Sequence, residues 1–154
     1  MDQTTFSKYV EDRYVDQVNW YDGKARENQT KYRRLQWVLI ILAAMTPALI
    51  ELDLNELIGK GFGHLATVTA GVVAILTAAM KTFKYQENWI NYRTTCEALR
   101  REKYYLDGAI GEYKNTANKE ALFIERAEGL MARENTLWIS TQKSDSKSEK
   151  EQQA

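Results

Sequence analysis

The chain has few of the residues that support chemistry or covalent cross-linking. Its 154 residues include one cysteine, one histidine and one proline. A single cysteine excludes an intrachain disulfide, and one histidine with one cysteine gives no metal-binding pattern. The sequence also has no glycine-rich phosphate loop before a helix and no nucleophile elbow. We therefore expect a protein that is not an enzyme and has no cofactor.

Neither sign of charge is in excess. The chain has 21 Lys and Arg residues against 21 Asp and Glu residues, with no isolated basic face, which argues against nucleic-acid binding. These charges are unevenly spread, because Leu35–Ile50 and Gly61–Met80 contain none of them. As helices these runs are about 24 Å and about 30 Å long, and the hydrocarbon core of a membrane is about 30 Å thick. We predict transmembrane spans at about residues 35–52 and 62–82.

A soluble helical bundle with two buried central helices is the alternative to membrane spans. Bulky side chains occur on every side of Leu35–Leu42. A chain of this length would have to cover two such helices with amphipathic helices, each of which offers one apolar stripe. The sequence therefore favours a helical membrane hairpin.

Basic residues close to each span predict its orientation. They precede the first span and follow the second, whereas the connecting loop offers only Lys60. By the positive-inside rule, both termini are expected in the cytoplasm. The flanking basic residues are Lys31, Arg33, Arg34, Lys81 and Lys84.

Apolar and aromatic residues outside the spans recur at alternating intervals of three and four, which is typical of a helix that packs against a partner by knobs-into-holes contacts. We predict cytoplasmic helices at about residues 5–34 and 83–110, the second continuing from its span without a break as far as Gly108 or Gly111. The first seam is Phe6, Val10, Tyr14, Gln17, Tyr21, Ala25, Asn28, Tyr32 and Leu35. The second is Tyr85, Trp89, Tyr92, Cys96, Leu99, Leu106, Ile110 and Tyr113, interrupted at Lys103.

A third cytoplasmic helix is predicted at about residues 118–139. One of its faces carries Ala121, Ile124, Met131 and Trp138. Residues 141–154 are almost free of apolar side chains and are expected to be a disordered tail. The predicted fold is an all-α membrane protein with a single domain, residues 4–140, in which a two-transmembrane hairpin extends into a cytoplasmic helical bundle.

Two stretches carry a family resemblance: "YVEDRYVDQVNWYDGKARENQTKYRRLQ" before the first span and "KYQENWINYRTTCEALRREKYYL" after the second. The chain resembles the bacterial SLATT superfamily, the SMODS- and SLOG-associating two-transmembrane effector domains, and in particular its stand-alone members of unknown function. This resemblance implies pore formation in a bacterial inner membrane, which in some members is triggered by a nucleotide-sensing partner protein. The matching positions include Asp12-Arg13, Gln17, Trp20-Tyr21, Trp89, Tyr92-Arg93, Glu97 and Glu102-Lys103.

A stripe of small and weakly polar residues on the second span is the candidate pore lining. At 100° per residue it lies opposite a bulkier face that includes Leu65, Val68, Val72, Leu76 and Phe83. The alternative is that the small stripe lets the first span approach closely, and both roles can coexist because Ala66, Ala70 and Ala74 form a neighbouring small face. The candidate pore-lining residues are His64, Thr67, Gly71, Ala74, Ala78 and Thr82.

Charged residues on the second cytoplasmic helix could form an anion site or a set of structural ion pairs. Spacings of three and four place Arg93 beside Glu97, and Glu97 beside Arg100 and Arg101, so mutual pairing is the expected arrangement. Burial against the other arm would then give orientation more than stability. The predicted structural network is Asp12, Arg13, Gln17, Trp20, Trp89, Arg93 and Glu97.

We expect a homo-oligomeric pore-forming protein whose partners are the lipid bilayer and other copies of itself. Two membrane helices cannot enclose a water-filled path, so about four to six chains are needed to close a ring. The alternative function is a non-conducting, membrane-anchored scaffold that recruits cytoplasmic partners.

Overall fold

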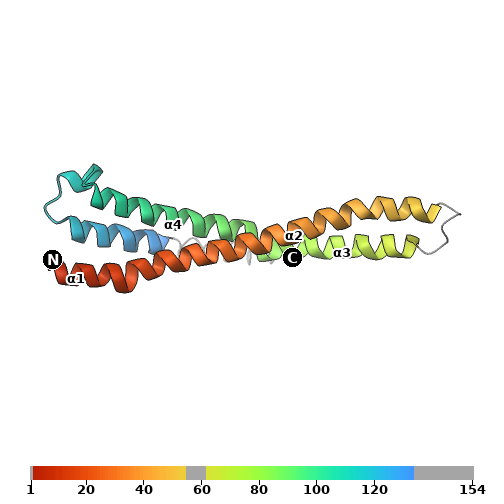
Figure 1. Cartoon of the computed structure of the whole chain (residues 1–154), viewed down its shortest axis with the longest axis horizontal. Coiled ribbons are helices and arrows are strands. Elements are labelled where there is room, and N and C mark those ends of the chain that lie inside the picture. Colours follow the sequence, from red (N-terminus) through yellow and green to blue (C-terminus); the bar gives the residue numbers. More distant parts are fainter. Residues whose placement is uncertain (1, 55–61, 134–154) are drawn as a thin grey trace, which may run out of the picture. The chain divides into compact units, whose positions relative to one another are not determined.

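A computed structural model of the chain describes residues 2–54 and 62–133. All regular secondary structure in these residues is helical (Figure 1). This confirms the predicted all-helical fold with two long apolar helices. Lys60, Trp138 and the predicted tail 141–154 lie outside the described residues.

The first half of the chain is one uninterrupted helical run. It begins with α1 (Gln3–Tyr9), passes through the π-helical segment η1 (Val10–Val15) and continues as α2 (Asp16–Leu54), which includes Pro47. The second half contains α3 (Phe62–Phe83), α4 (Tyr85–Asp107), the short 3-10 helix η2 (Gly111–Lys114) and a helix over residues 119–133.

The chain divides into two units, and α2 and α4 each contribute to both. One consists of Met1–Lys24 with Ile90–Ala154, and the other is Ala25–Trp89. We call their described parts the bundle unit (residues 2–24 and 90–133) and the hairpin unit (residues 25–54 and 62–89).

In the hairpin unit, α2 and α3 run side by side in opposite directions and together line one cavity (Figure 1). One face of α3 is covered, because Ala66 is only 4% exposed and positions three and four residues apart along the helix are half-buried. These half-buried positions are Thr69, Val73, Leu76 and Met80.

The predicted continuous helix from the second span is wrong at Lys84. This residue separates α3 from α4 and has a φ of +47°, the left-handed conformation that side chains disfavour. The side-chain amide of Asn88 donates to the Phe83 carbonyl at 3.3 Å and its backbone N–H donates to Lys84 at 2.9 Å. The rings of Phe83 and Tyr85 stack across the break, 5.6 Å apart. The sequence offered no glycine or proline that would have indicated this interruption.

The bundle unit is built around a core to which the N-terminal helical run, α4, η2 and the helix over residues 119–133 all contribute. Figure 1 shows these segments along the chain. Leu99, Tyr113 and Phe123 are fully buried, and the Phe123 ring lies 5.1 Å from that of Tyr14 and 5.9 Å from that of Phe6. The N-terminal seam is confirmed, because every one of its predicted positions is buried or half-buried. The core residues are Tyr14, Val18, Tyr21, Cys96, Leu99, Tyr113, Phe123, Ala127 and Met131.

Two predicted core positions are wrong. Ile110 is 49% exposed, although the pattern placed it on the α4 seam. In the helix over residues 119–133, Ala121 is exposed and the buried face centres on Phe123 and Ala127. Ile124 and Met131 of the predicted face are half-buried and buried, so the true face is rotated by a fraction of a turn.

The end of α4 explains why Ile110 leaves the seam. The Ile110 N–H donates to the Tyr105 carbonyl and the Ala109 N–H to the Leu106 carbonyl, both at 3.1 Å, which is the Schellman pattern of a helix C-terminus. The left-handed residue of this motif is Ala109, with a φ of +48°, and not the neighbouring Gly108. The reversal of the chain after Asp107 therefore turns Ile110 away from the core.

Candidate functional site

The predicted pore-lining stripe lies on the outer surface of the hairpin unit. All six of its residues are exposed, and they occupy the part of α3 that does not face α2. An added Cβ at Gly71 would meet no atom within 4 Å, so this glycine is not required for close packing within the chain. The exposed stripe is His64, Thr67, Gly71, Ala74, Ala78 and Thr82.

Among the described residues, the stripe is not the face of α3 that is covered within the hairpin unit. The face of α3 that packs within the hairpin includes Ala66 and Leu76, and Leu76 had been placed with the bulky outer residues. Ala70 and Ala74, predicted as a neighbouring packing face, are exposed. The described residues leave the small stripe exposed, and small residues at such spacing permit the close approach of another helix.

Large apolar side chains are exposed on both helices of the hairpin unit. Ile75 is 70% exposed, Val68 is 64% exposed and Trp37 is 62% exposed. In the first long helical run, 0% of the most apolar 18-residue stretch is buried. In the second run, 6% of the corresponding stretch is buried. The core helices of a soluble protein would be mostly buried, whereas the described residues leave these surfaces uncovered.

Three threonine hydroxyls of α3 form hydrogen bonds with backbone carbonyls of the same helix. The hydroxyls of Thr69, Thr77 and Thr82 donate to the backbone carbonyls four residues earlier, at 2.7, 2.8 and 3.0 Å. A threonine with this bond tolerates an apolar surrounding because its donor has a partner. The polarity of Thr82 is therefore compatible with either lipid or water around the stripe.

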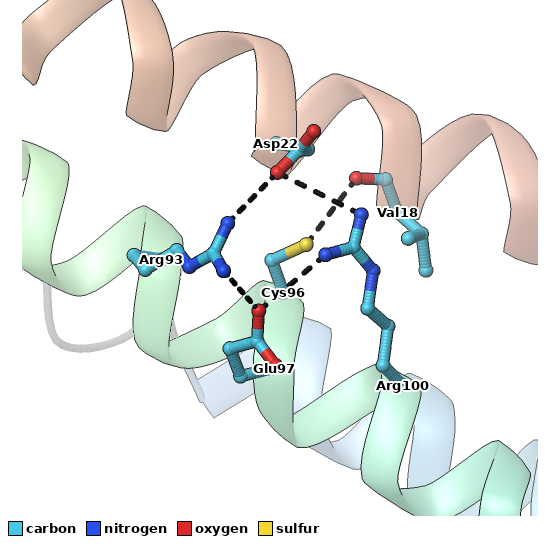
Figure 2. Close-up of polar contacts among 6 residues, drawn as sticks. All are labelled: Val18, Asp22, Arg93, Cys96, Glu97 and Arg100. Atoms are coloured by element: carbon cyan, nitrogen blue, oxygen red, sulfur yellow. Dashed lines mark hydrogen bonds and ion pairs between the residues drawn. The ribbon is translucent and has the colours of Figure 1, made fainter.

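A second feature is a charged cluster in the bundle unit, drawn in Figure 2. Asp22 of α2 is only 8% exposed, and its Oδ1 lies 3.1 Å from Arg93 Nη1 and 3.7 Å from Arg100 Nη2. Glu97 Oε1 accepts from the same two arginines, at 2.6 and 3.4 Å. The two carboxylates and two guanidinium groups therefore alternate around a closed circuit. Each charge has partners of opposite sign, which makes the cluster a structural joint between α2 and α4 and not an open anion site.

Cys96 lies beneath this cluster (Figure 2). Its side chain is fully buried, and its Sγ donates to the Val18 carbonyl at 3.7 Å. Burial raises the pKa of the Cys96 thiol above its usual 9.0. The thiol is therefore protonated at neutral pH and acts as a small core residue.

The predicted network is only partly formed. Pairing of Glu97 with Arg93 and Arg100 is confirmed. On the other arm, the carboxylate that pairs with Arg93 and Arg100 is Asp22. Asp22 follows the seam residue Tyr21, and a carboxylate next to a seam is the signal that could have identified it.

The other members of the predicted network lie elsewhere. Asp12 is exposed and Gln17 is half-buried. The Trp20 ring contacts the Tyr92 ring in the bundle unit, with centroids 5.6 Å apart. Trp89 belongs to the hairpin unit, where its indole N–H is buried.

Arg13 forms a clamp with Glu128 that sequence reasoning did not find. Arg13 Nη2 donates to Glu128 Oε2 at 2.7 Å, and the Tyr9 hydroxyl donates to Glu128 Oε1 at 3.0 Å. These bonds join the N-terminal helix to the helix over residues 119–133, with 115 residues between Arg13 and Glu128. No local pattern links positions so far apart.

A further buried ion pair secures the end of the bundle. The buried carboxylate of Glu102 accepts from the Tyr113 hydroxyl at 2.7 Å and from Arg126 Nη1 at 3.0 Å. Arg126 also contacts Glu112 at 2.7 Å. Burial, together with the bond to Glu102, raises the pKa of Tyr113 above its usual 10.0. The hydroxyl therefore stays a donor over the whole physiological pH range.

Glu128→Gln is expected to destabilise the bundle slightly at pH 7 and progressively less as the pH falls below 4.5. The bond from Arg13, followed by the one from Tyr9, lowers the pKa of Glu128 below its usual 4.5. This stabilisation is complete above the unfolded-state pKa and disappears as the pH falls through the folded-state pKa. Because the pair is partly exposed, we expect a fall in melting temperature of roughly 1 to 3 °C. In circular dichroism melts the difference between the two chains should shrink as the pH falls below 4.5, and a difference that does not shrink with pH would contradict an ionic origin.

The fold therefore defines an all-helical protein with two long, outwardly apolar helices and an ion-paired helical bundle. A profile of the family described as "Protein of unknown function (DUF4231)" matches residues 16–121, more than half of the chain. The chain belongs to this family. No curated protein and no solved structure matches it significantly.

Proposed function

We propose that the chain is a two-span membrane protein of the bacterial inner membrane that assembles from several copies into an ion-conducting pore. The observation that carries this proposal is the exposure of the whole small stripe of α3, from His64 to Thr82. Since α2 does not cover the stripe, α3 helices from neighbouring chains can turn it toward a common axis.

Membrane insertion is supported by the exposed apolar surface of the hairpin unit. Side chains such as Trp37 and Ile75 would be costly to hydrate, at about 25 cal/mol for each Å² of apolar area, and lipid removes this cost. Basic residues at the ends of both spans, including Arg33 and Lys81, support cytoplasmic termini by the positive-inside rule.

Several chains are needed to form a conducting path. Two helices from one chain enclose no water, whereas a ring of about four to six copies can surround an axis. The resemblance to the SLATT superfamily supports the same assembly and suggests a nucleotide-sensing protein as its trigger. We place the bundle unit in the cytoplasm, where it could receive such a signal.

The alternative is a non-conducting scaffold anchored in the membrane. One observation that favours it is that threonine hydroxyls of α3 donate to backbone carbonyls and need no water as a partner. Another is the exposed aromatic surface on the bundle unit, where Tyr104 is 72% exposed. A scaffold would use that surface to recruit cytoplasmic partners.

Cysteine accessibility in the assembled protein separates the two functions. In a Cys96→Ala background, a charged thiol reagent should block most of the ion flux through liposomes that contain Thr67→Cys and little of it with Val72→Cys. Both positions are exposed in the single chain, so only assembly can make them differ. Gly71→Ser should alter flux while the oligomer keeps its size, because the chain has open space at this position.

The scaffold predicts other results. Intact oligomers would show no flux at any voltage, pH or nucleotide concentration, or the reagent would act equally at both cysteines. Oligomer size, measured by size-exclusion chromatography with light scattering, is the control for each variant.

A further inference from the structure

A cavity of about 340 Å³ lies in the hairpin unit between α2, α3 and the first turn of α4. This volume is within the range of about 300 to 1,000 Å³ that is typical of small-molecule sites. Leu39 and Met80 contribute apolar surface, and Tyr32 and Gln36 are polar neighbours on α2. The cavity therefore offers both an apolar wall and a polar wall to one ligand.

Two lysines and one carboxylate supply the charge of the cavity. Lys81 lies in the last turn of α3, Lys84 at the break between α3 and α4, and Glu87 in the first turn of α4. Because the two ammonium groups outnumber the carboxylate, the cavity favours an anionic ligand. Lysine ammonium groups bind phosphate oxygens as point charges.

The backbone at Lys84 is a second, independent observation. A lysine in the left-handed region is held in a conformation that glycine would adopt without strain. Such outliers cluster at binding sites, where the surrounding structure maintains them. Here the outlier is itself one of the residues that line the cavity.

We propose that this cavity binds the phosphate of an anionic glycerophospholipid. Lys81 and Lys84 bind the phosphate oxygens, and the first part of an acyl chain lies along Leu39 and Met80. This inference rests on the proposed membrane placement, in which Lys81 and Lys84 mark the cytoplasmic end of the second span. Basic pockets between membrane helices on that side are suited to anionic headgroups, because the cytoplasmic leaflet carries negative charge.

The test is lipid binding to the purified full-length chain, measured by native mass spectrometry with phosphatidylglycerol and phosphatidylcholine. The parent should retain phosphatidylglycerol selectively. Lys81→Gln and Lys84→Gln should each weaken that retention by about fivefold, the effect of one lysine near an anionic surface. Glu87→Gln should strengthen it. Lys84→Gly removes the charge without opposing the left-handed backbone, so it should weaken binding like Lys84→Gln while the chain stays folded.

Lys31→Gln is the matched control, because Lys31 is exposed, pairs with Glu27 at 2.6 Å and does not line the cavity. Equal retention of phosphatidylcholine, or equal losses in the control and in the cavity variants, would overturn the proposal. Displacement of the lipid by millimolar inorganic phosphate would instead indicate a site for free phosphate and would also overturn it.

Alkaline extraction of membranes distinguishes a failure of the proposed lipid site from a failure of the proposed function. If the parent chain is released, the membrane placement fails and the lipid site fails with it. If the chain stays in the membrane and shows no selectivity for phosphatidylglycerol, the lipid site alone is wrong.

Discussion

Leu99→Asp is expected to unfold the bundle unit. The Leu99 side chain is fully buried among the core residues, and its backbone carbonyl accepts a bond from the Tyr14 hydroxyl at 2.8 Å. Burial raises the pKa of Tyr14 to about 12, so its hydroxyl stays protonated, and a tyrosine offers no positive charge to a new carboxylate. An unpaired carboxylate at this position costs roughly 3 to 5 kcal/mol, a large part of the typical total stability of about 5 to 15 kcal/mol.

The measurement is thermal unfolding by circular dichroism, together with protease resistance of residues 90–133. Ile110→Asp is the matched control, because the sequence pattern placed Ile110 on the same seam and the structure leaves it 49% exposed. We expect Ile110→Asp to melt within a few degrees of the parent. Similar losses in both variants, or in neither, would show that the core is wrongly assigned.

Phe123→Ala is expected to detach the helix over residues 119–133 from the bundle. The Phe123 ring is fully buried and contacts the rings of Phe6 and Tyr14. Removing a buried phenylalanine leaves a cavity and costs roughly 3 to 5 kcal/mol. Loss of this contact should also release the Arg13–Glu128 clamp, because it joins the same two segments.

Hydrogen exchange of the backbone amides in residues 119–133 would measure this detachment directly. Ala121→Gln is the control on the same helix. Ala121 is exposed and its backbone N–H donates to Asn118 Oδ1 at 3.1 Å, so a glutamine there suits the capping box. Its exchange should match the parent. Protection that survives Phe123→Ala would mean that other contacts hold the helix in place.

Periodic patterns identified the seam of the N-terminal arm and most of the α4 seam. A helix that packs along one side must repeat its buried residues every three and four positions, and the pattern persists through Tyr14, Tyr21 and Tyr92 without reference to any partner. The absence of charge in two runs likewise indicated the two long apolar helices, because each run is continuous along the chain.

Features that depend on a distant partner escaped the sequence. Asp22 pairs with Arg93 across 71 residues, and Glu128 pairs with Arg13 across 115 residues. From the sequence alone, several carboxylates are possible partners for each arginine. Which of them pairs with it depends on how the helices pack. The break at Lys84 also escaped the sequence, since the residue type gives no reason to expect a left-handed backbone there.

The two apolar runs and the seam of the first arm could be predicted from the sequence, because they follow from local composition and from the fixed period of the α-helix. The tertiary structure alone decided which face of α3 is covered and which is exposed. Both faces consist mainly of small or apolar residues, so the pattern could not indicate which one is buried. Packing within the hairpin unit covers Ala66 and its neighbours and leaves the stripe from His64 to Thr82 exposed. The buried ion pairs have the same origin, because the free energy of a charge depends on the partners that folding places within reach.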